Sequence, residues 1–484
     1  MMKIAFTTLG CKLNYAETST YERGFLAEGW EIVPWTSRAD VYLINTCAVT
    51  ETAEKKSRNL IRRAHKTAPD ARIVVTGCYA ELRKEALLAI EGVWKVFGAA
   101  EKSSVVPVTA SLSVLSTETG RNVDRTGVSG SSSTKPGRNV DGTGVSGSSS
   151  TKPGQNVDGT GVSGSSSTKP GQNVDGDVVS GSSSTKPGQN VDGTFGAYSS
   201  GERTRSFLKV QDGCDNFCAY CTVPYARGRS RSIPICEVVK MARSIAADGV
   251  KEVVLTGVNT GDFGRTGGES FLDLLKALNE VEGIERYRIS SIEPNLITPE
   301  IIDWIASGTK FQRHFHIPLQ SGSDTLLKRV GRRYDTALFA SRIDYIRSAM
   351  ERPGEPLVFF GIDVIVGLPG ETEELFMETY HFLKDRIRPA FIHVFPYSRR
   401  PGTRAAEWKD QVQDSIKTER VARLETLCRE LHDAFLEANK GLPGRVLWES
   451  TRKDGKMGGY TGNYIRVERP FDPARVNELE DIIL

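Results

Sequence analysis

The chain has 484 residues, long enough for two or three domains, and carries eight cysteines. A net charge of +3 identifies no partner, and no apolar stretch reaches the roughly 20 residues that a membrane-spanning helix needs. The first residues become polar too soon to form a secretory segment. The cysteines are therefore expected to be metal ligands in a reducing compartment, the cytoplasm, and not to form disulfides.

Residues 1–105 alternate short apolar runs with helix-like stretches, which predicts an α/β domain with a parallel sheet. Three of the runs, KIAFTTLGC, VYLINTC and RIVVTGC, end at Cys11, Cys47 and Cys78. Because loops at the carboxyl ends of parallel strands line one crevice, the three thiols are expected to converge into a metal site. The alternative is three free cysteines in a core.

Residues 106–200 contain a tandem repeat in which SSSTKPG recurs at 131, 148, 165 and 182. The unit is rich in Gly, Ser, Thr and Pro and has few large apolar side chains, so it cannot bury enough surface to offset its ordering entropy. A β-solenoid is the alternative for a fixed period, but one or two valines per unit make a poor core. We expect a disordered linker.

After the linker, Cys214, Cys218 and Cys221 form a C-x3-C-x2-C run. Closed zinc sites and ordinary iron–sulfur clusters use four protein ligands, so three thiolates indicate a cluster with one open iron. The alternatives are a zinc knuckle that recruits Cys236, or a chance grouping. Cys236 and Cys428 lie in amphipathic stretches and are expected to be ordinary helix or core residues.

Residues 201–438 alternate strand and helix six times, which predicts an open (βα)6 partial barrel. The expected strands are SFLKVQ, EVVLT, RYRIS, HFHIPL, LVFFGIDVIVG and FIHVF. Barrel active sites lie at the carboxyl ends of strands, where polar residues and glycines cluster in this chain. His314 and His316 share one face of a strand, and packing or hydrogen bonding is favoured over a ligand role.

Four basic runs could supply phosphate contacts, although a solvated helix face explains any single run as well. They are KKSRNLIRRAHK (55–66), RGRSR (227–231), KRVGRRY (328–334) and SRRPGTR (398–404). The sequence of residues 439–484 predicts a small β module.

The string VQDGCDNFCAYC, with Tyr220 before its third cysteine, resembles the signature of the radical S-adenosylmethionine (SAM) superfamily. The resemblance implies a [4Fe-4S] cluster on Cys214, Cys218 and Cys221 whose open iron binds SAM for reductive cleavage to a radical. It also implies three sets of contacts to SAM. Backbone groups at the end of the second strand would contact its methionine part, and residues after the third strand would contact its polar parts. Residues after the fifth strand would support its adenine. The residues expected to bind this cofactor are Thr256, Gly257, Ser291, Glu293, Gln320 and Gly367.

Two three-cysteine sites in this order resemble those of the methylthiotransferases. The local sequences around the first three cysteines, GCKLNYAET, NTCAVTETAEKKSR and TGCYAE, support the resemblance. The likeness covers almost the whole chain outside residues 106–200. It implies a second [4Fe-4S] cluster on Cys11, Cys47 and Cys78, two uses of SAM, an electron donor not identified by the sequence, and a C-terminal TRAM RNA-binding domain with an OB-like barrel.

Within that group, TGVNTGDFG, HFHIPLQSGSD and HVFPYSRRPGT most resemble the subfamily that acts on threonylcarbamoyladenosine in tRNA. That subfamily converts this nucleoside, on the 3′ side of the anticodon, to its 2-methylthio form. Two other substrates of a methylthiotransferase are the alternatives: isopentenyladenosine in tRNA and an aspartate of a ribosomal protein. A hypothesis of another class is a non-catalytic RNA-binding protein with structural zinc.

Overall fold

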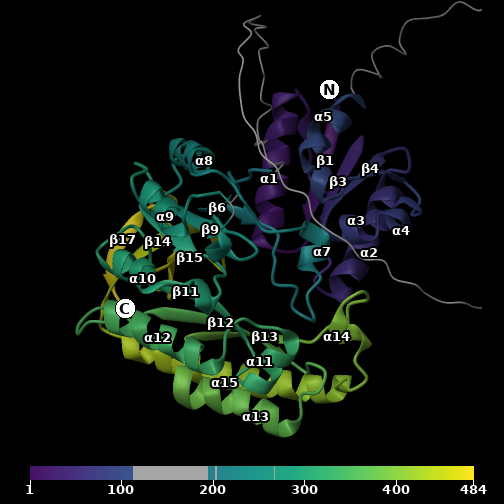
Figure 1. Ribbon diagram of the computed structural model, residues 1–484. Helices are drawn as coiled ribbons and strands as arrows, with labels where there is room; N and C mark the ends of the chain where they lie inside the picture. The colour runs from purple at the N-terminus through teal and green to yellow at the C-terminus, as the bar shows by residue number, and fades with distance from the viewer. Residues whose placement is uncertain (113–194, 202–203, 266) are drawn as a thin grey trace, which may run out of the picture. The chain divides into compact units, whose positions relative to one another are not determined.

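The computed structural model describes residues 1–112, 195–201, 204–265 and 267–484 (Figure 1). The 17-residue repeats lie outside the described residues. Two described pieces fall within the predicted linker: helix α5 (Val105–Ala110), and Phe195 with Ala197, which are buried in the same core as Val105. Structured chain thus extends past residue 105, because apolar side chains continue there. None of the helices in the described part is both long and apolar enough to cross a membrane.

The N-terminal region is built on a five-stranded, wholly parallel sheet in the order β2-β1-β3-β4-β5. Its strands are β1 (Lys3–Thr8), β2 (Glu31–Ile32), β3 (Val41–Thr46), β4 (Arg72–Gly77) and β5 (Val93–Val96). The central strands β3 and β4 are buried almost throughout, as Val- and Ile-rich runs covered on both faces should be. The predicted α/β class and parallel sheet are confirmed here.

Helices cover both faces of this sheet. One face packs against α2 (Glu51–Thr67), α3 (Cys78–Leu82) and α4 (Lys84–Leu88), and the other against α1 (Lys12–Ala27) and α5. The core under α1 also includes Phe207 and Val254, which belong to strands of the next region. The Tyr15 ring meets the Phe207 ring edge-on at 5.8 Å, so α1 lies against strand β6, as Figure 1 shows.

Six parallel strands follow, all at the positions predicted from sequence. They are β6 (Arg205–Lys209), β9 (Glu252–Thr256), β10 (Arg286–Ile289), β11 (His314–Gln320), β12 (Phe359–Val366) and β13 (Phe391–Pro396). β6, β9 and β10 form one parallel sheet and β11, β12 and β13 another. A parallel bridge between Tyr287 and Phe311 joins the two in chain order, with a hydrogen bond from Ile292 N to His316 O of 3.1 Å.

In the part of the chain that the structure describes, no ladder joins β6 to β13, so the six strands form an open barrel. Its outer face packs on helices in the largest apolar core of the protein. The remaining elements of this region are β7 (Gln211–Asp212), α7 (Val223–Arg227), β8 (Arg231–Ser232), α8 (Ile235–Ala247), η2 (Thr260–Asp262), α9 (Phe271–Asn279), η3 (Pro294–Leu296), α10 (Pro299–Ala306), α11 (Asp324–Val330), α12 (Thr336–Met350), α13 (Glu373–His381), η4 (Phe382–Ile387), α14 (Arg404–Glu407) and α15 (Asp414–Asn439).

The chain ends in a four-stranded antiparallel sheet in the order β16-β15-β14-β17. Its elements are β14 (Pro443–Lys453), β15 (Lys456–Tyr460), β16 (Arg466–Pro470), η5 (Pro473–Arg475) and β17 (Leu479–Ile483). Buried arginines connect it to the barrel: Arg288 donates to Thr461 O at 2.6 Å and to Glu252 at 2.9 Å. Burial alone would raise the pKa of Glu252, but Arg288, Arg286 and Arg205 hold it at about 2.

Candidate active site

Cys11, Cys47 and Cys78 come together at the carboxyl edge of the N-terminal sheet. Cys47 directly follows β3, Cys78 directly follows β4, and Cys11 begins α1 just beyond β1. A Cβ placed on Gly10 would lie 2.9 Å from the Cys47 Cβ and 3.2 Å from its Sγ, so only a glycine lets the loop approach this closely. The three thiols interact electrostatically with one another.

Two polar side chains hold this edge together. Asn14 donates to the carbonyls of Leu9 at 2.8 Å and Thr46 at 2.9 Å, which ties the loop after β1 to the end of β3. Arg227 comes from α7, beyond the linker, and donates from Nε to the Cys78 Sγ at 3.3 Å and from its guanidinium to the Asn14 Oδ1. One arginine therefore places positive charge beside a sulfur of this group.

Arg227 belongs to a buried cluster of five charged side chains. Lys102 and Lys209 contact Glu17 at 2.7 and 2.9 Å, and Arg227 contacts Asp212 at 2.9 Å and Glu17 at 3.2 Å. Burial alone would raise the pKa of Glu17, but Lys102, Lys209 and Arg227 lower it to about 2. Buried charges persist only when paired, so the cluster fixes the position of Arg227.

The protein environment alone does not ionise the Cys47 and Cys78 thiols. Burial raises the pKa of Cys47 to about 11 and also raises the pKa of Cys78, although Arg227 opposes the rise at Cys78. A thiol with so high a pKa ionises near neutral pH only when a metal replaces its proton. Two such thiols together with Cys11 at one sheet edge, beside an arginine, fit a metal or iron–sulfur group.

The second group, Cys214, Cys218 and Cys221, lies on the loop between β7 and α7. The loop starts at Gly213, where φ is +75° and a Cβ would lie 2.0 Å from the Arg229 carbonyl oxygen, so a side chain is excluded. Phe217 adopts a left-handed φ of +47° between the first two cysteines. These turns wrap the loop, and its thiols lie near enough to influence one another's pKa.

Hydrogen-bond donors point at every sulfur of this loop. The backbone N–H of Asn216 lies 3.5 Å from the Cys214 Sγ, and that of Val223 lies 3.4 Å from the Cys221 Sγ. Arg332 donates to the Cys218 Sγ at 3.4 Å. Burial raises the pKa of Cys214 to about 11 and of Cys221 to about 12. Donors aimed at sulfur suit thiolates that carry a cluster.

Candidate cofactor residues adjoin this loop. Glu293 accepts two hydrogen bonds of 2.9 Å from Asn216 Nδ2 and pairs with Arg332 at 2.7 Å, so it lies beside the cysteines. Ser291 accepts through its carbonyl from Thr260 at 2.9 Å. Asn259 follows the second strand and accepts from the Glu293 backbone at 3.2 Å.

Two polar atoms at this strand end have no partner among the described residues. They are the Thr256 Oγ1 and the Asn259 Nδ2, both buried. Gly257 lies between them in sequence, and a Cβ there would lie 2.9 Å from the Gln211 Oε1, so close packing excludes a side chain at this position. Buried polar groups are nearly always hydrogen-bonded, so these atoms fit a polar ligand such as SAM.

The other two candidates also end barrel strands. Gln320 closes β11 with a left-handed φ of +70°. Gly367 follows β12 with φ of +75°, but a Cβ there would lie 2.3 Å from the Lys417 Cγ. Gly367 is thus required for close packing against α15, whatever else it contacts.

The cysteines outside the two groups are helix residues, as expected. Cys236 is exposed in α8, whereas Cys428 is buried in α15 and accepts from the Ile392 N–H at 3.2 Å. The two histidines of β11 make packing and hydrogen-bond contacts. His314 stacks on Phe359 with a centroid distance of 5.3 Å, and His316 lies 2.7 Å from the Asp363 Oδ1.

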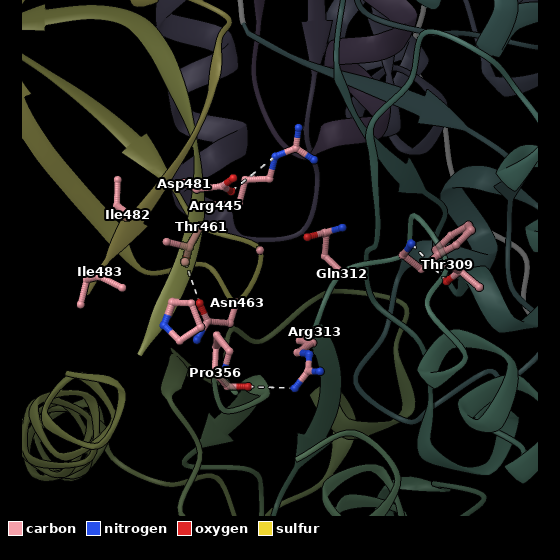
Figure 2. Close-up of a pocket in the computed structure, with 14 residues that line it drawn as sticks. Thr309, Gln312, Arg313, Pro356, Arg445, Thr461, Asn463, Asp481, Ile482 and Ile483 are labelled. Atoms are coloured by element: carbon pink, nitrogen blue, oxygen red, sulfur yellow. Dashed lines mark hydrogen bonds and ion pairs between the residues drawn. The ribbon is translucent and has the colours of Figure 1, made fainter. Parts of the chain in front are cut away.

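A cavity of about 630 Å³ lies elsewhere, between the barrel and the C-terminal sheet (Figure 2). Its walls include Phe311, Gln312 and Arg313, which precede β11, and Thr461 to Asn463. Phe311, Gln312 and Arg313 lie at the amino-terminal end of β11, the opposite end of the barrel from Cys214. The cavity therefore plays no part in the cysteine sites.

An open barrel of six parallel strands, with three cysteines in the loop after the first strand, defines a radical SAM protein. Comparison agrees, because the Radical SAM superfamily matches residues 208–383 and a family described as Uncharacterized protein family UPF0004 matches residues 3–98.

Similar proteins define the family more narrowly. The chain is 36% identical to the threonylcarbamoyladenosine tRNA methylthiotransferase MtaB of Bacillus subtilis, covering 96% of this chain and 90% of that protein. It is 34% identical to MtaB of Aquifex aeolicus, covering 97% of each, and 30% identical to a tRNA-2-methylthio-N(6)-dimethylallyladenosine synthase of Geobacter metallireducens, covering 98% and 94%. The chain therefore belongs to the radical SAM methylthiotransferases, a family of transferases.

Among solved structures, the radical SAM methyltransferase TsrM from Kitasatospora setae has a similar fold. The TM-score is 0.51 at 14% identity, covering 84% of this chain and 75% of TsrM.

Proposed function

We propose that this chain is a tRNA methylthiotransferase that converts N6-threonylcarbamoyladenosine, next to the anticodon on its 3′ side, to its 2-methylthio derivative. The observation that carries the proposal is the presence of two separate three-cysteine groups in one chain, each with an arginine donating to a sulfur. Relatives named for threonylcarbamoyladenosine, at up to 36% identity, support the substrate.

Each three-cysteine group would hold one [4Fe-4S] cluster with one iron left without a protein ligand. When bound, the two clusters and SAM supply the radical chemistry and the sulfur that an unactivated ring carbon requires. Arg227 and the backbone around Asn14 would orient the N-terminal group, and Arg332 with the N–H groups of Asn216 and Val223 would orient the second.

SAM would lie at the carboxyl ends of the barrel strands. Thr256, Gly257 and Asn259 would meet its methionine part, because the Thr256 Oγ1 and the Asn259 Nδ2 are buried without a partner in the described part of the chain. Ser291 and Glu293 would approach other polar parts of SAM. Gln320 and the turn at Gly367 complete the proposed set, and an electron donor outside this chain would supply the reducing electron.

The tRNA would contact basic surface and the C-terminal region. On α2, Lys55, Lys56, Arg62 and Arg63 are exposed and can bind phosphates. We propose a TRAM-like, OB-like RNA-binding role for residues 439–484, supported by the antiparallel sheet there. The proposed organisation is a methylthiotransferase domain at 1–105 with α5 packed against it, a linker within 106–200 and a radical SAM domain at 201–438, acting in the cytoplasm where tRNA is found.

The test is nucleoside analysis of tRNA treated with reconstituted enzyme, SAM and a reductant. The proposal expects 2-methylthio-threonylcarbamoyladenosine from tRNA that carries threonylcarbamoyladenosine. Methylthiolation of isopentenyladenosine instead would place the chain with its dimethylallyladenosine relatives. Modification of a ribosomal-protein aspartate would also contradict the proposal. Bound zinc without visible absorption would favour the non-catalytic RNA-binding alternative.

A further inference from the structure

The segment that follows β13, residues 397–406, contacts the surroundings of both cysteine groups. It leaves the barrel at Tyr397, whose N–H donates to the Val366 carbonyl at 2.8 Å. It contains the basic run at 398–404, which composition alone would assign to phosphate binding. The contacts of its two ends show a different role.

The later part of the segment is attached to the loop of the second cysteine group (Cys214, Cys218 and Cys221). The Ala405 N–H donates to the Ala219 carbonyl at 2.9 Å, and Arg404 donates to the Phe217 carbonyl at 3.2 Å. Both carbonyls belong to that loop, on either side of its middle cysteine. Tyr397 and Ala405 also pack with Ala219 in one buried apolar cluster. The segment is therefore fixed to the backbone of the second group.

The earlier part of the segment is attached to the first turn of α2, close in sequence to the first cysteine group (Cys11, Cys47 and Cys78). Arg400 forms an ion pair with Glu54, and the two side chains are only 5% and 13% exposed. The Ser398 hydroxyl accepts from the Glu51 N–H at 3.5 Å. Since α2 begins four residues after Cys47, these contacts hold the chain that leaves the first group.

A tight turn separates the two sets of contacts. The N–H and the hydroxyl of Thr403 both donate to the Arg400 carbonyl, at 3.1 and 2.7 Å. Pro401 restricts its own φ, and Gly402 adopts a φ of +89° that other residues rarely reach. The turn is therefore stiff, so a contact at Arg400 sets the position of α2 relative to the second cysteine loop.

We propose that Arg400 is a positioning residue whose ion pair with Glu54 fixes the first cysteine group relative to the second. This inference rests on the proposed function and deepens it. In that reaction the radical produced at the second group and the sulfur held at the first must reach the same ring carbon. A displacement of about 1 Å in such an arrangement can cost about 100-fold in rate. Loss of the ion pair should therefore spare SAM cleavage and impair transfer to the base.

Two variants break the ion pair from opposite sides, and a third is the matched control. Arg400→Met leaves Glu54 with Arg58 at 3.9 Å, so no lone buried charge remains to unfold the protein. Glu54→Gln removes the charge of the partner and keeps its shape. Arg399→Met removes the same charge from the adjacent, exposed residue, whose hydrogen bond to the Ala406 carbonyl stays within the segment.

Three quantities are measured on reconstituted full-length enzyme. They are the iron content, the ratio of methylthio nucleoside formed to 5′-deoxyadenosine released, and the distance distribution between the two reduced clusters by pulsed electron paramagnetic resonance. Arg400→Met and Glu54→Gln are expected to keep about eight irons per chain. Their product ratio should fall by about 10-fold to 100-fold, because a radical that misses the base takes a hydrogen atom from the reductant. Their distance distribution should broaden or shift, whereas Arg399→Met should match wild type.

Three results would overturn the inference. The first is a wild-type ratio and distribution in both Arg400→Met and Glu54→Gln. The second is a lower ratio with an unchanged distribution, which would assign Arg400, whose buried Nε has no partner among the described residues, to direct contact with the substrate. The third is loss of about four irons in both variants, which would make the ion pair a requirement for cluster binding. Failure of the proposed function looks different, because then wild type itself forms no methylthio nucleoside.

Discussion

The Nε of Arg227 lies 3.3 Å from the Sγ of Cys78, although 149 residues separate them in sequence. Arg227 ends α7, the helix that directly follows the Cys214–Cys221 loop, so one short helix links the two cysteine groups. The same guanidinium pairs with Glu17 and Asp212, both nearly inaccessible to solvent. The geometry of the first group therefore depends on a residue of the helix that follows the second.

Replacing Arg227 by Met should destabilise the protein strongly. The change leaves Asp212 and Glu17 with fewer partners, and removing one member of a buried ion pair costs about 3–5 kcal/mol. The matched control is Arg229→Met, whose side chain is 74% exposed and should change stability by less than about 0.5 kcal/mol. Urea unfolding of both variants measures this, and equal midpoints would show that the cluster of charges does not hold the structure.

Gly10→Ala should damage the first cysteine group. The new Cβ would lie 2.9 Å from the Cys47 Cβ and must adopt φ of +109°, so Cys11 and Cys47 are forced apart. Gly29→Ala is a close control, because Gly29 also has positive φ (+76°) but has nothing within 4 Å of its Cβ position. Iron per chain should fall only in the Gly10 variant; an unchanged iron content there would argue against a cluster at this site.

Arg332→Gln should weaken SAM cleavage while the second cysteine group keeps its iron. The substitution removes the donor to the Cys218 Sγ and the partner of Glu293. Removing a hydrogen-bond partner of a metal ligand typically lowers activity by about 10-fold to 100-fold. Formation of 5′-deoxyadenosine by wild type, Arg332→Gln and the exposed neighbour variant Arg333→Gln measures this. A full rate in Arg332→Gln would exclude a role for this contact.

Removing charge from α2 should weaken tRNA binding with little effect on folding. Changing Lys55, Arg62 and Arg63 to Gln removes three exposed cations. If all three contact phosphates, the slope of log affinity against log salt should fall by about 3. The exposed pair Lys240 and Arg243 on α8, changed to Gln, serves as the control. Equal slopes for both sets of variants would place the tRNA elsewhere.

The sequence was sufficient to locate the strands and to propose that their cysteines meet. Apolar runs mark β3 and β4 clearly because both strands are buried on two faces, and parallel pairing then brings Cys47 and Cys78 to one edge. The sequence could not predict Arg227 beside Cys78, since no local pattern encodes a contact across 149 residues.

The basic runs show the same limit. Arg227, Arg332 and Arg400 each lie in a run considered for phosphate binding, yet their side chains are at most 7% exposed and pair with Asp212, Glu293 and Glu54 respectively. Composition shows that a segment is basic, but tertiary packing determines which of its arginines remain at the surface.

The central claim is that this chain holds two independent clusters, and counting iron and sulfide tests it most directly. The measurement compares anaerobically reconstituted wild type with the Cys214/Cys218/Cys221→Ala triple variant. The account predicts about eight irons per chain in wild type and about four in the variant, as two four-iron clusters require. About four irons in wild type and none in the variant would mean that Cys11, Cys47 and Cys78 bind no cluster, and would contradict the methylthiotransferase mechanism.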